Sequence, residues 1–162
     1  MVAEDGSTEI KAEPLADTPS GWTAVIAEGR IDSADIFRAH KTTRRGLHEE
    51  AFAEAAGHGF DEALFANERG EFAEGSRTNL FLEREGVLLT PPVSSGALLP
   101  GCLRAELIEE GRAREAVLTP DDLADGTLYL GNSLRGLVRR AWGRSRRRRD
   151  RPVPTPAARA RS

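Results

Sequence analysis

Between residues 62 and 92, short apolar runs alternate with turn signals. "EALFAN" precedes the turn "ERGE", "NLFLER" precedes the turn "EGV", and "VLLTPP" ends at two consecutive prolines. Short apolar runs separated by glycine-containing turns predict β-strands. This stretch argues against a helical bundle, so we expect a turn-rich domain of the α+β or α/β class.

Further elements flank this block on both sides. "GWTAVIAEGRI" (21–31) predicts a strand, and residues 47–59 predict a helix. The apolar face expected for that helix comprises Leu47, Ala51, Phe52, Ala55 and Ala56. An amphipathic helix is expected after Pro100-Gly101, followed by a strand over 113–119, a short helix over 120–125 and a strand over 127–133. Thr119 is the expected N-cap of the short helix, with Pro120 in its first turn and Asp122 three residues after the cap.

Charge is distributed unevenly along the 162 residues, a length that suits one domain. Residues 135–162 contain eleven arginines and one acidic residue, whereas the remainder carries twelve basic and twenty-five acidic side chains. We expect a polar lead-in over 1–21, a folded domain over 22–143 and a disordered tail over 144–162. The tail has no interleaved aromatic residues, so we do not expect a specific nucleic-acid site there.

Composition excludes several other classes of protein. No apolar run has membrane-spanning length, and "MVAEDGSTEI" has neither a basic start nor an apolar core. Cys102 is the single cysteine, so no internal disulfide can form, and no Cys/His cluster predicts a metal site. We expect a cytoplasmic protein without metal or membrane partners.

Lys41 is one of only two lysines in a chain that contains twenty-one arginines. An amine can lose its proton near neutral pH and attack a carbonyl, which a guanidinium cannot do. Lys41 is therefore a candidate for Schiff-base chemistry. The alternative is an ordinary exposed charge, which is what we expect of Lys11.

Three other stretches are candidates for binding. Glu74 in "AEGSRTNLF" (73–81) lies between a strand and a Gly-Ser turn, where it can pair with a protonated heterocycle or cap the turn. "LLPGCLR" (98–104) has a glycine opening a helix, which suits phosphate but is also common to ordinary helix starts. "YLGNSLRG" (129–136) places Asn132 and Ser133 at a strand end, where they complete such a phosphate site or form a plain turn.

In their order, "HKTTRR", "AEGSRTNLF", "LLPGCLR" and "YLGNSLRG" resemble the class IV aminotransferases, the fold-type IV pyridoxal 5'-phosphate (PLP) enzymes. In that family a Schiff-base lysine is followed by a "(T/A)EG…N(L/V)F" hairpin, a "(L)PG…R" helix start and a strand that ends in small polar residues. The match covers about residues 22–140. "HKTTRR" together with "GNSLRG" is most similar to the aminodeoxychorismate lyase branch, in the version fused to a para-aminobenzoate synthase component.

The resemblance implies a role for each matching residue. Lys41 would hold PLP and carry the proton at the substrate Cα, and Glu74 would contact the pyridine nitrogen. The amides of Cys102 and Leu103 would bind the phosphate, and the Cys102 thiol would be a small buried filler. Asn132 and Ser133 would lie on the phosphate or substrate-carboxylate side. Arg44 and Arg45 are placed to approach the anionic cofactor or substrate.

The resemblance also implies a fold, reactions and partners. The fold would be the C-terminal domain of the fold-type IV enzymes, with a barrel-like β core flanked by helices, in a possible homodimer. The reaction would be pyruvate elimination from 4-amino-4-deoxychorismate to give 4-aminobenzoate in folate biosynthesis. The alternatives are transamination of branched-chain or D-amino acids to keto acids, and an inactive remnant or binding module with a basic tail.

Only about forty residues precede Lys41, whereas a full member of this family has an N-terminal α/β domain there. That domain closes the cleft and supplies an arginine for the phosphate. We therefore expect that the chain lacks this domain. In isolation it should bind PLP weakly and turn over little or no substrate.

Overall fold

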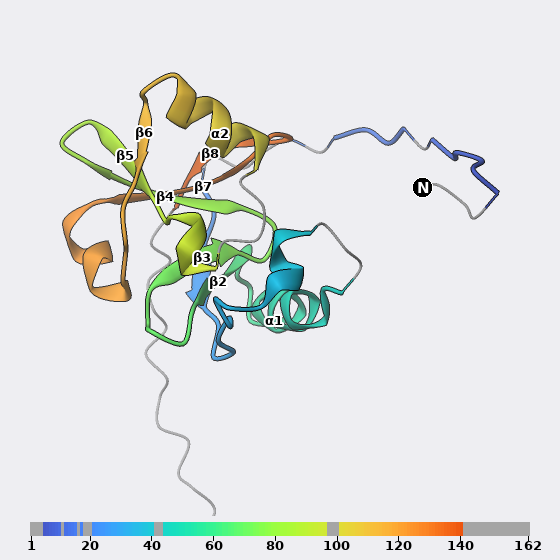
Figure 1. Cartoon of the computed structure of the whole chain (residues 1–162), viewed down its shortest axis with the longest axis horizontal. Coiled ribbons are helices and arrows are strands. Elements are labelled where there is room, and N and C mark those ends of the chain that lie inside the picture. Colours follow the sequence, from blue (N-terminus) through green and yellow to red (C-terminus); the bar gives the residue numbers. More distant parts are fainter. Residues whose placement is uncertain are drawn as a thin grey trace, which may run out of the picture.

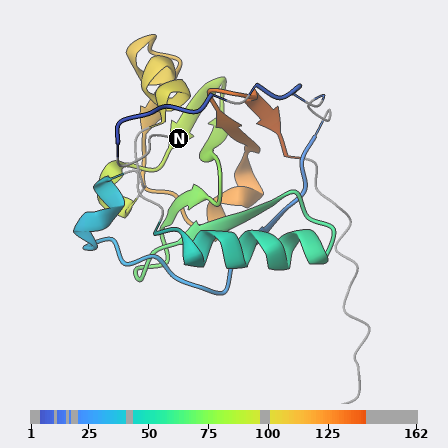
Figure 2. The same cartoon turned by 90° about the vertical axis from the view of Figure 1, so that its right-hand side faces the viewer.

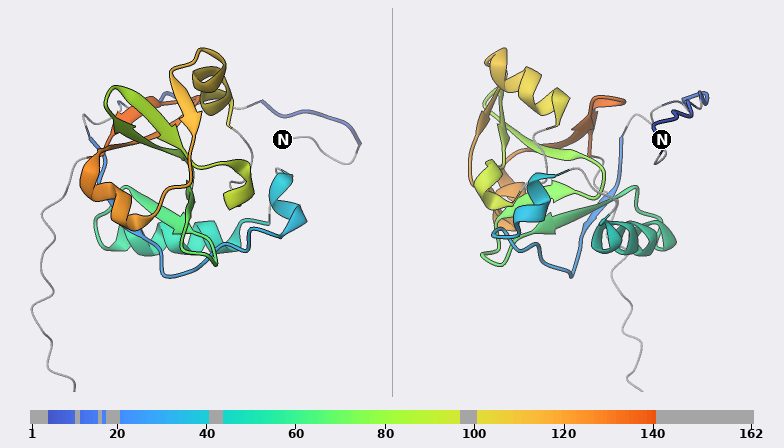
Figure 3. Two further views of the ribbon diagram at one scale, coloured as in Figure 1. Left: turned by 60° about the vertical axis from the view of Figure 1, so that its left-hand side comes forward. Right: turned by 45° about the vertical axis from the view of Figure 1, so that its right-hand side comes forward.

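The computed structural model describes residues 5–10, 12–15, 17, 21–40, 44–96 and 101–140. They form two β-sheets, and one helix covers the outer side of each sheet (Figure 1). Figures 2 and 3 show α1 (Gly46–Gly57) and α2 (Cys102–Glu109) on opposite sides of the β structure. Among the described residues, no helix has the length and apolar character needed to cross a membrane.

The smaller sheet has the strand order β1-β2-β3, with β1 parallel and β3 antiparallel to β2. Its strands are β1 (Ala24–Ile26), β2 (Glu62–Ala66) and β3 (Phe72–Gly75). The larger sheet has the order β6-β5-β4-β7-β8, antiparallel except for the parallel pair β5–β6. Its strands are β4 (Asn79–Arg84), β5 (Val87–Thr90), β6 (Ala113–Glu115), β7 (Thr127–Asn132) and β8 (Gly136–Arg139).

Three short 3-10 helices connect these elements: η1 (Ile36–Ala39), η2 (Val93–Ser95) and η3 (Pro120–Asp125). The expected cap of η3 is confirmed, because the Thr119 amide donates to Oδ2 of Asp122 at 2.7 Å. The β-strands expected from the turn signals are also confirmed, and β4 and β5 pair antiparallel around the turn at 85–86.

The main core lies between the two sheets and follows from strand alternation. Leu80 and Leu82 face this core, whereas Phe81 between them packs with Leu107 of α2. In the smaller sheet, Leu64 belongs to the core and its neighbour Phe65 to the side covered by α1. Each sheet therefore buries both faces, one against the other sheet and one against its helix.

The apolar face expected for α1 is partly wrong. His48 and Ala55, two helical turns apart, are its buried residues, while Leu47 is 40% exposed. Ala56 is exposed as well. Because α1 packs on β2 along the line through His48 and Ala55, its buried face is rotated away from Leu47.

The expected barrel-like closure is wrong for the described residues. β6 and β8 remain as the two edges of the larger sheet, whereas closure requires hydrogen bonds around the whole circumference. A single bridge, Trp22 with Arg140, joins the N-terminal segment to the end of β8. Two strands are shorter than we expected. In place of 21–31, β1 spans Ala24–Ile26 and ends before the bend at 28–29, and in place of 113–119, β6 ends at Glu115. The tail over 144–162 lies outside the described residues.

Candidate functional site

A pocket of about 320 Å³ opens between η1 and the start of α1. Its lining comprises Asp35, Phe37, Arg38, His40, Arg44, Arg45, Gly46, Leu47 and His48. Three arginines and two histidines accompany a single acidic residue in this lining. The pocket therefore has the composition of a binding site for an anion.

A β-bulge between β2 and β3 directs Glu74 toward α1. Glu74 pairs with Phe65, whereas the next pair is Ala66 with Phe72, so Ala73 is an extra residue in β3. Opposite residues of an antiparallel pair share a face, and a bulge re-aims the side chains beside it. Glu74 therefore lies inside β3 on the face covered by α1, and not after the strand as we expected.

The carboxylate of Glu74 is buried and contacts two basic side chains. Its Oε1 accepts a hydrogen bond from Nη2 of Arg38 at 2.6 Å and lies 2.9 Å from Nε2 of His48. The side chains of Glu74, Arg38 and His48 are 8%, 11% and 5% exposed. The His48 ring packs against Phe65, with the ring centroids 4.8 Å apart. These contacts fix the orientation of the carboxylate next to Arg38 and His48, which line the pocket, whereas Glu74 itself is not among the lining residues.

Arg38 is held on its other side by the backbone after η2. Its Nε donates to the carbonyl oxygen of Gly96 at 3.0 Å. Gly96 has a φ of 88°, and a Cβ there would lie 3.0 Å from Cγ2 of Ile31, so a glycine suits this position. η1 itself begins at Asp35, whose Oδ1 accepts from the amide of Phe37 at 3.0 Å.

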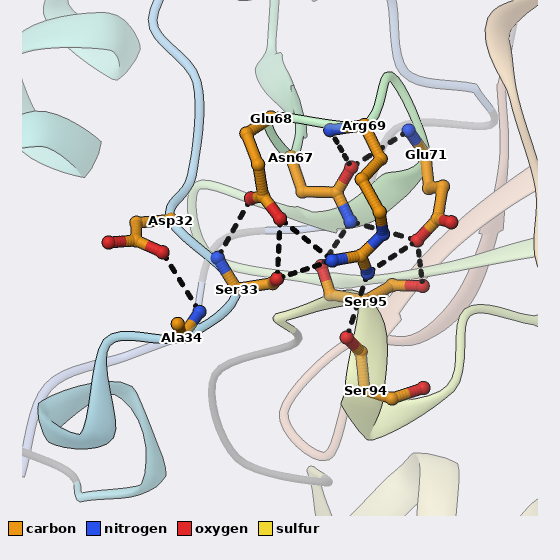
Figure 4. Close-up of polar contacts among 9 residues, drawn as sticks. All are labelled: Asp32, Ser33, Ala34, Asn67, Glu68, Arg69, Glu71, Ser94 and Ser95. Atoms are coloured by element: carbon orange, nitrogen blue, oxygen red, sulfur yellow. Dashed lines mark hydrogen bonds and ion pairs between the residues drawn. The ribbon is translucent and has the colours of Figure 1, made fainter.

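A second polar cluster, centred on Arg69, joins three chain segments outside the pocket (Figure 4). Nη1 of Arg69 donates to Oγ of Ser33 at 2.6 Å and to Oε1 of Glu68 at 2.7 Å. Nη2 donates to Oε2 of Glu71 at 2.7 Å and to the carbonyl oxygen of Ser94 at 3.0 Å. The cluster ties the loop before η1 and the residues of η2 to the β2–β3 turn, and it thereby supports the segment that holds Arg38.

The two carboxylates of this cluster have strongly lowered pKa values. The pKa of Glu71 falls to about 2, because the side chains of Arg69, Asn67 and Ser95 donate to it. The pKa of Glu68 also falls to about 2, mainly because the hydroxyl and amide of Ser33 donate to its carboxylate. Both groups are therefore ionised acceptors at neutral pH.

The start of α2 has no side-chain cap. Gly101 is the N-cap and supplies no side-chain hydrogen bond to the first turn. The first helical residues are Cys102 and Leu103, as we expected. The expectation of a buried Cys102 thiol is wrong, because Cys102 is exposed. Arg104 and Leu107 form the buried face of α2, and Cys102 lies roughly 200° around the helix from Arg104.

The end of β7 meets the start of α2. A Cβ on Gly131 would lie 2.8 Å from Cδ2 of Leu103, so the glycine permits this close approach. Nδ2 of Asn132 donates to the carbonyl oxygen of Arg77 at 3.2 Å, and Ser133 is exposed. The structure thus brings Leu103 and Asn132 into the same region, and Asn132 also contacts the turn that leads from Glu74 to β4.

A family model described as amino-transferase class IV matches residues 3–140. The chain belongs to the class IV aminotransferase family. This match covers both sheets, the pocket and the start of α2. The resemblance inferred from the four sequence stretches is confirmed at the level of the family.

Relatives within the family differ in their activities. One similar solved structure, from Mesorhizobium loti, is described as an amino-acid aminotransferase. It is 42% identical to this chain with a TM-score of 0.80, and the match covers 88% of this chain and 70% of that chain. Another, from Legionella pneumophila, is described as a 4-amino-4-deoxychorismate lyase. It is 28% identical with a TM-score of 0.74, and the match covers 80% of this chain and 50% of that chain. The branched-chain-amino-acid aminotransferase of Escherichia coli K12 is 34% identical over 82 residues. That match covers 51% of this chain and 26% of the enzyme, so the chain spans about a quarter of its curated relatives.

Class IV aminotransferases use PLP, and the described residues of this family member fit its chemistry. The cationic pocket suits an anionic group such as the substrate carboxylate. The buried Glu74 suits a pyridine nitrogen, and the uncapped start of α2 suits a phosphate. Among the described residues, no group of histidine, cysteine or acidic side chains could hold a metal ion.

Lys41 lies outside the described residues, as does Lys11. Its nearest described neighbours along the chain, His40 and Arg44, both line the pocket. Arg45 lines it too, and its Nη2 donates to the carbonyl oxygen of Ser76 at 2.5 Å. The assignment of Lys41 as the reactive amine therefore stays a prediction.

Arg38 and His48 are site residues that we did not predict. His48 had a readable signal, because positions 48, 51, 52 and 55 follow helical spacing once histidine is counted with the apolar residues. Arg38 had none, because its contact with Glu74 joins positions thirty-six residues apart.

Proposed function

We propose that this chain carries the cofactor-binding part of a PLP-dependent enzyme that transaminates an amino acid at its α-carbon. The observation that carries the proposal is the buried carboxylate of Glu74, oriented by Arg38 and His48 beside the cationic pocket. The similarity to aminotransferases supports this reaction over the lyase reaction that the sequence motifs favoured.

Lys41 supplies the amine of the site. With PLP bound, Lys41 would hold the cofactor through its amine and would carry the proton at the substrate Cα. An arginine cannot take this part, because its guanidinium does not lose its proton near neutral pH. PLP supplies the electron sink that makes this Cα proton removable.

Glu74 would hold the pyridine nitrogen of the cofactor, and its negative charge would favour the protonated form of that nitrogen. Arg38 and His48 hold Oε1 of Glu74 in a fixed direction, so the carboxylate does not have to reorganise during the reaction. The bulge at Ala73 contributes by directing Glu74 to this face of the sheet.

The amides of Cys102 and Leu103 at the start of α2 would hold the phosphate of the cofactor. Asn132 and Ser133 lie on the same side, since the end of β7 packs against Leu103. Arg44 and Arg45 neutralise the negative charge of the cofactor or of the substrate carboxylate from the pocket wall.

A second candidate function is elimination of pyruvate from 4-amino-4-deoxychorismate, which gives 4-aminobenzoate. The similarity to the Legionella pneumophila protein favours it, as do the stretches "HKTTRR" and "GNSLRG". The same proton transfer by Lys41 serves both reactions. They differ in whether a leaving group departs or the proton is returned to the cofactor.

Borohydride trapping tests the cofactor site. The purified chain is incubated with PLP, reduced and mapped by peptide mass spectrometry, with Lys41→Arg as the control variant. We expect one pyridoxyl group on Lys41 and none on Lys11. Equal labelling of both lysines, or the same labelling pattern in Lys41→Arg, would contradict the proposed function.

Product analysis separates the two reactions. Single-turnover reactions with L-glutamate, branched-chain amino acids and aminodeoxychorismate are compared at equal protein and cofactor concentrations. We expect a keto acid from the amino acids. Release of 4-aminobenzoate, with no keto acid from any amino acid, would replace the aminotransferase assignment by the lyase.

A further inference from the structure

Glu62 is a fully buried carboxylate at the start of β2, and it lies outside the pocket lining. Its Oε1 accepts from the amides of Ala63 and Ser76, each at 3.0 Å, and from the Ser76 hydroxyl. Its Oε2 accepts from the amide of Arg77 at 3.3 Å and from Oγ1 of Thr78 at 2.9 Å. All five donors are N–H or O–H groups, so the side chain acts only as an acceptor.

Four of these five bonds go to one short turn. Residues 75–78 connect β3 to β4, and the amide of Gly75 donates to the carbonyl oxygen of Thr78 at 2.8 Å. A Cβ on Gly75 would lie 2.4 Å from Oγ1 of Thr78 and 3.1 Å from the Glu62 carboxyl, so the backbone packs directly on this acid. Among the described residues no cationic side chain pairs with Glu62. The hydrogen bonds from the turn amides and hydroxyls therefore offset the free-energy cost of burying this carboxylate.

The opposite side of the same turn holds two residues of the candidate site. The carbonyl oxygen of Ser76 accepts from Nη2 of Arg45 at 2.5 Å. The carbonyl oxygen of Arg77 accepts from Nδ2 of Asn132 at 3.2 Å. The amide of Arg77 and the carbonyl group of Ser76 belong to the same peptide plane, so the bond from this amide to Glu62 helps to set where the Ser76 carbonyl oxygen points. The Thr78 hydroxyl, which also donates to Glu62, holds the residue that follows Arg77. The turn thus connects one buried acid to the pocket wall and to the end of β7.

We propose that Glu62 is a positioning residue of the cofactor site, which holds the 75–78 turn and with it the contacts that the turn makes with Arg45 and Asn132. Glu62 does not touch the cofactor. It acts on Arg45 through the peptide group that joins Ser76 and Arg77, and on Asn132 by holding the residues on both sides of the Arg77 carbonyl group. It also binds the amide of Ser76, which directly follows the end of β3. This inference rests on the proposed function, because it assigns the turn to the PLP site.

The main variant is Glu62→Gln, which keeps the size of the side chain but replaces an acceptor oxygen by an NH₂ donor. At least one of the turn donors then faces another donor. Thr78→Val is a milder variant that removes one hydroxyl and keeps the shape of the side chain. Glu83→Gln is the matched control, since Glu83 lies in β4 and accepts from the hydroxyl of Tyr129 at 3.2 Å, away from the turn.

Two measurements are made on each variant. The PLP dissociation constant is obtained by absorbance titration, and we expect Glu62→Gln to raise it by about tenfold, as is typical when an outer-sphere partner is lost. NMR reports the side-chain amide of Asn132 and the hydrogen exchange of the Ser76 and Arg77 amides. We expect Glu62→Gln to shift the Asn132 signal and to accelerate both exchange rates. Thr78→Val should give smaller changes of the same kind, and Glu83→Gln none.

The outcomes are separable. A lowered melting temperature with unchanged PLP affinity and an unchanged Asn132 signal would show that Glu62 is merely structural, and would overturn the proposal. If Glu62→Gln does not fold, Thr78→Val decides by the same two measurements. If the unmodified chain does not bind PLP, the proposed function fails. The Asn132 signal then still decides whether Glu62 places the turn.

Discussion

Arg38 in η1 and Glu74 in β3 meet at 2.6 Å, although they lie thirty-six residues apart in the sequence. His48 of α1 approaches the same carboxylate oxygen at 2.9 Å. Three elements of different kinds therefore converge on one buried atom beside the cationic pocket. The two contacts give the Glu74 carboxylate a fixed orientation, which a glutamate in an isolated turn would not have. The contributions of Glu74 and His48 can each be tested by mutation.

Glu74→Gln should weaken PLP binding by about 10- to 100-fold, because it removes the charge opposite the pyridine nitrogen, and hydrogen bonds to charged groups contribute about 1.5–3 kcal/mol. The dissociation constant is measured by absorbance titration, with borohydride labelling of Lys41 as a second readout. Glu109→Gln at the exposed end of α2 is the control and should bind as the unmodified chain does. Equal affinities in Glu74→Gln and Glu109→Gln would remove Glu74 from the cofactor site.

His48→Ala should lower the free energy of unfolding by about 1–3 kcal/mol, because it leaves a cavity beside Phe65 and removes one partner of the buried Glu74. His58→Ala is a control on the same helix, since His58 is exposed at the C-cap of α1. Its effect should stay within about 0.5 kcal/mol. Urea unfolding measures both. If the two variants were equally stable, His48 would not have the packing role that its burial indicates.

The order of strands and helices could be predicted because turn residues and apolar runs carry local signals. Pro120 after Thr119 and Gly101 before Cys102 mark helix starts through backbone constraints that act within a few residues. The grouping of Cys102, Leu103 and Asn132 at one site followed from the family resemblance and stays a prediction. Of these contacts, the structure shows that Leu103 packs closely on Gly131, the residue before Asn132.

Contacts that depend on pairing could not be predicted in the same way. The bulge at Ala73 exists only because β3 pairs with β2 in a particular register, and it decides which face Glu74 occupies. The buried face of α1 was misjudged by one position, because His48 has a polar side chain but packs on Phe65. Whether the strands close into a barrel depends on pairing between the edges of the two sheets, where the amide of Trp22 donates to the carbonyl oxygen of Arg139 at 3.1 Å and the amide of Phe72 to that of Leu118 at 2.7 Å. Such pairing joins distant segments and carries no local signal in the sequence.

Gly131→Ala should destabilise the fold by about 1–3 kcal/mol, because the added Cβ would lie 2.8 Å from Cδ2 of Leu103 and 2.9 Å from the carbonyl oxygen of Gly136. It should also weaken PLP binding, since relief of the clash moves the start of α2 away from β7. Gly57→Ala is the control, because nothing lies within 4 Å of its Cβ position and it occupies the last turn of α1. Thermal unfolding and PLP titration are measured on both variants. A Gly131→Ala chain as stable as Gly57→Ala would refute the close packing of α2 on β7.

Glu71 provides a test of the Arg69 cluster by pH. Its pKa is about 2 in the folded chain and 4.5 for an unperturbed side chain, mainly because Arg69 and Asn67 donate to its carboxylate. A lowered folded-state pKa adds stability that is fully present above the unfolded value and is lost as the pH falls through the folded value. The unmodified chain should therefore be more stable than Glu71→Gln at about pH 6, and the gap should shrink between about pH 4.5 and pH 2. Urea midpoints at constant ionic strength measure this gap, with Glu50→Gln on the exposed side of α1 as the control. A gap that stayed constant down to about pH 2 would show that the charge of Glu71 does not hold the cluster together.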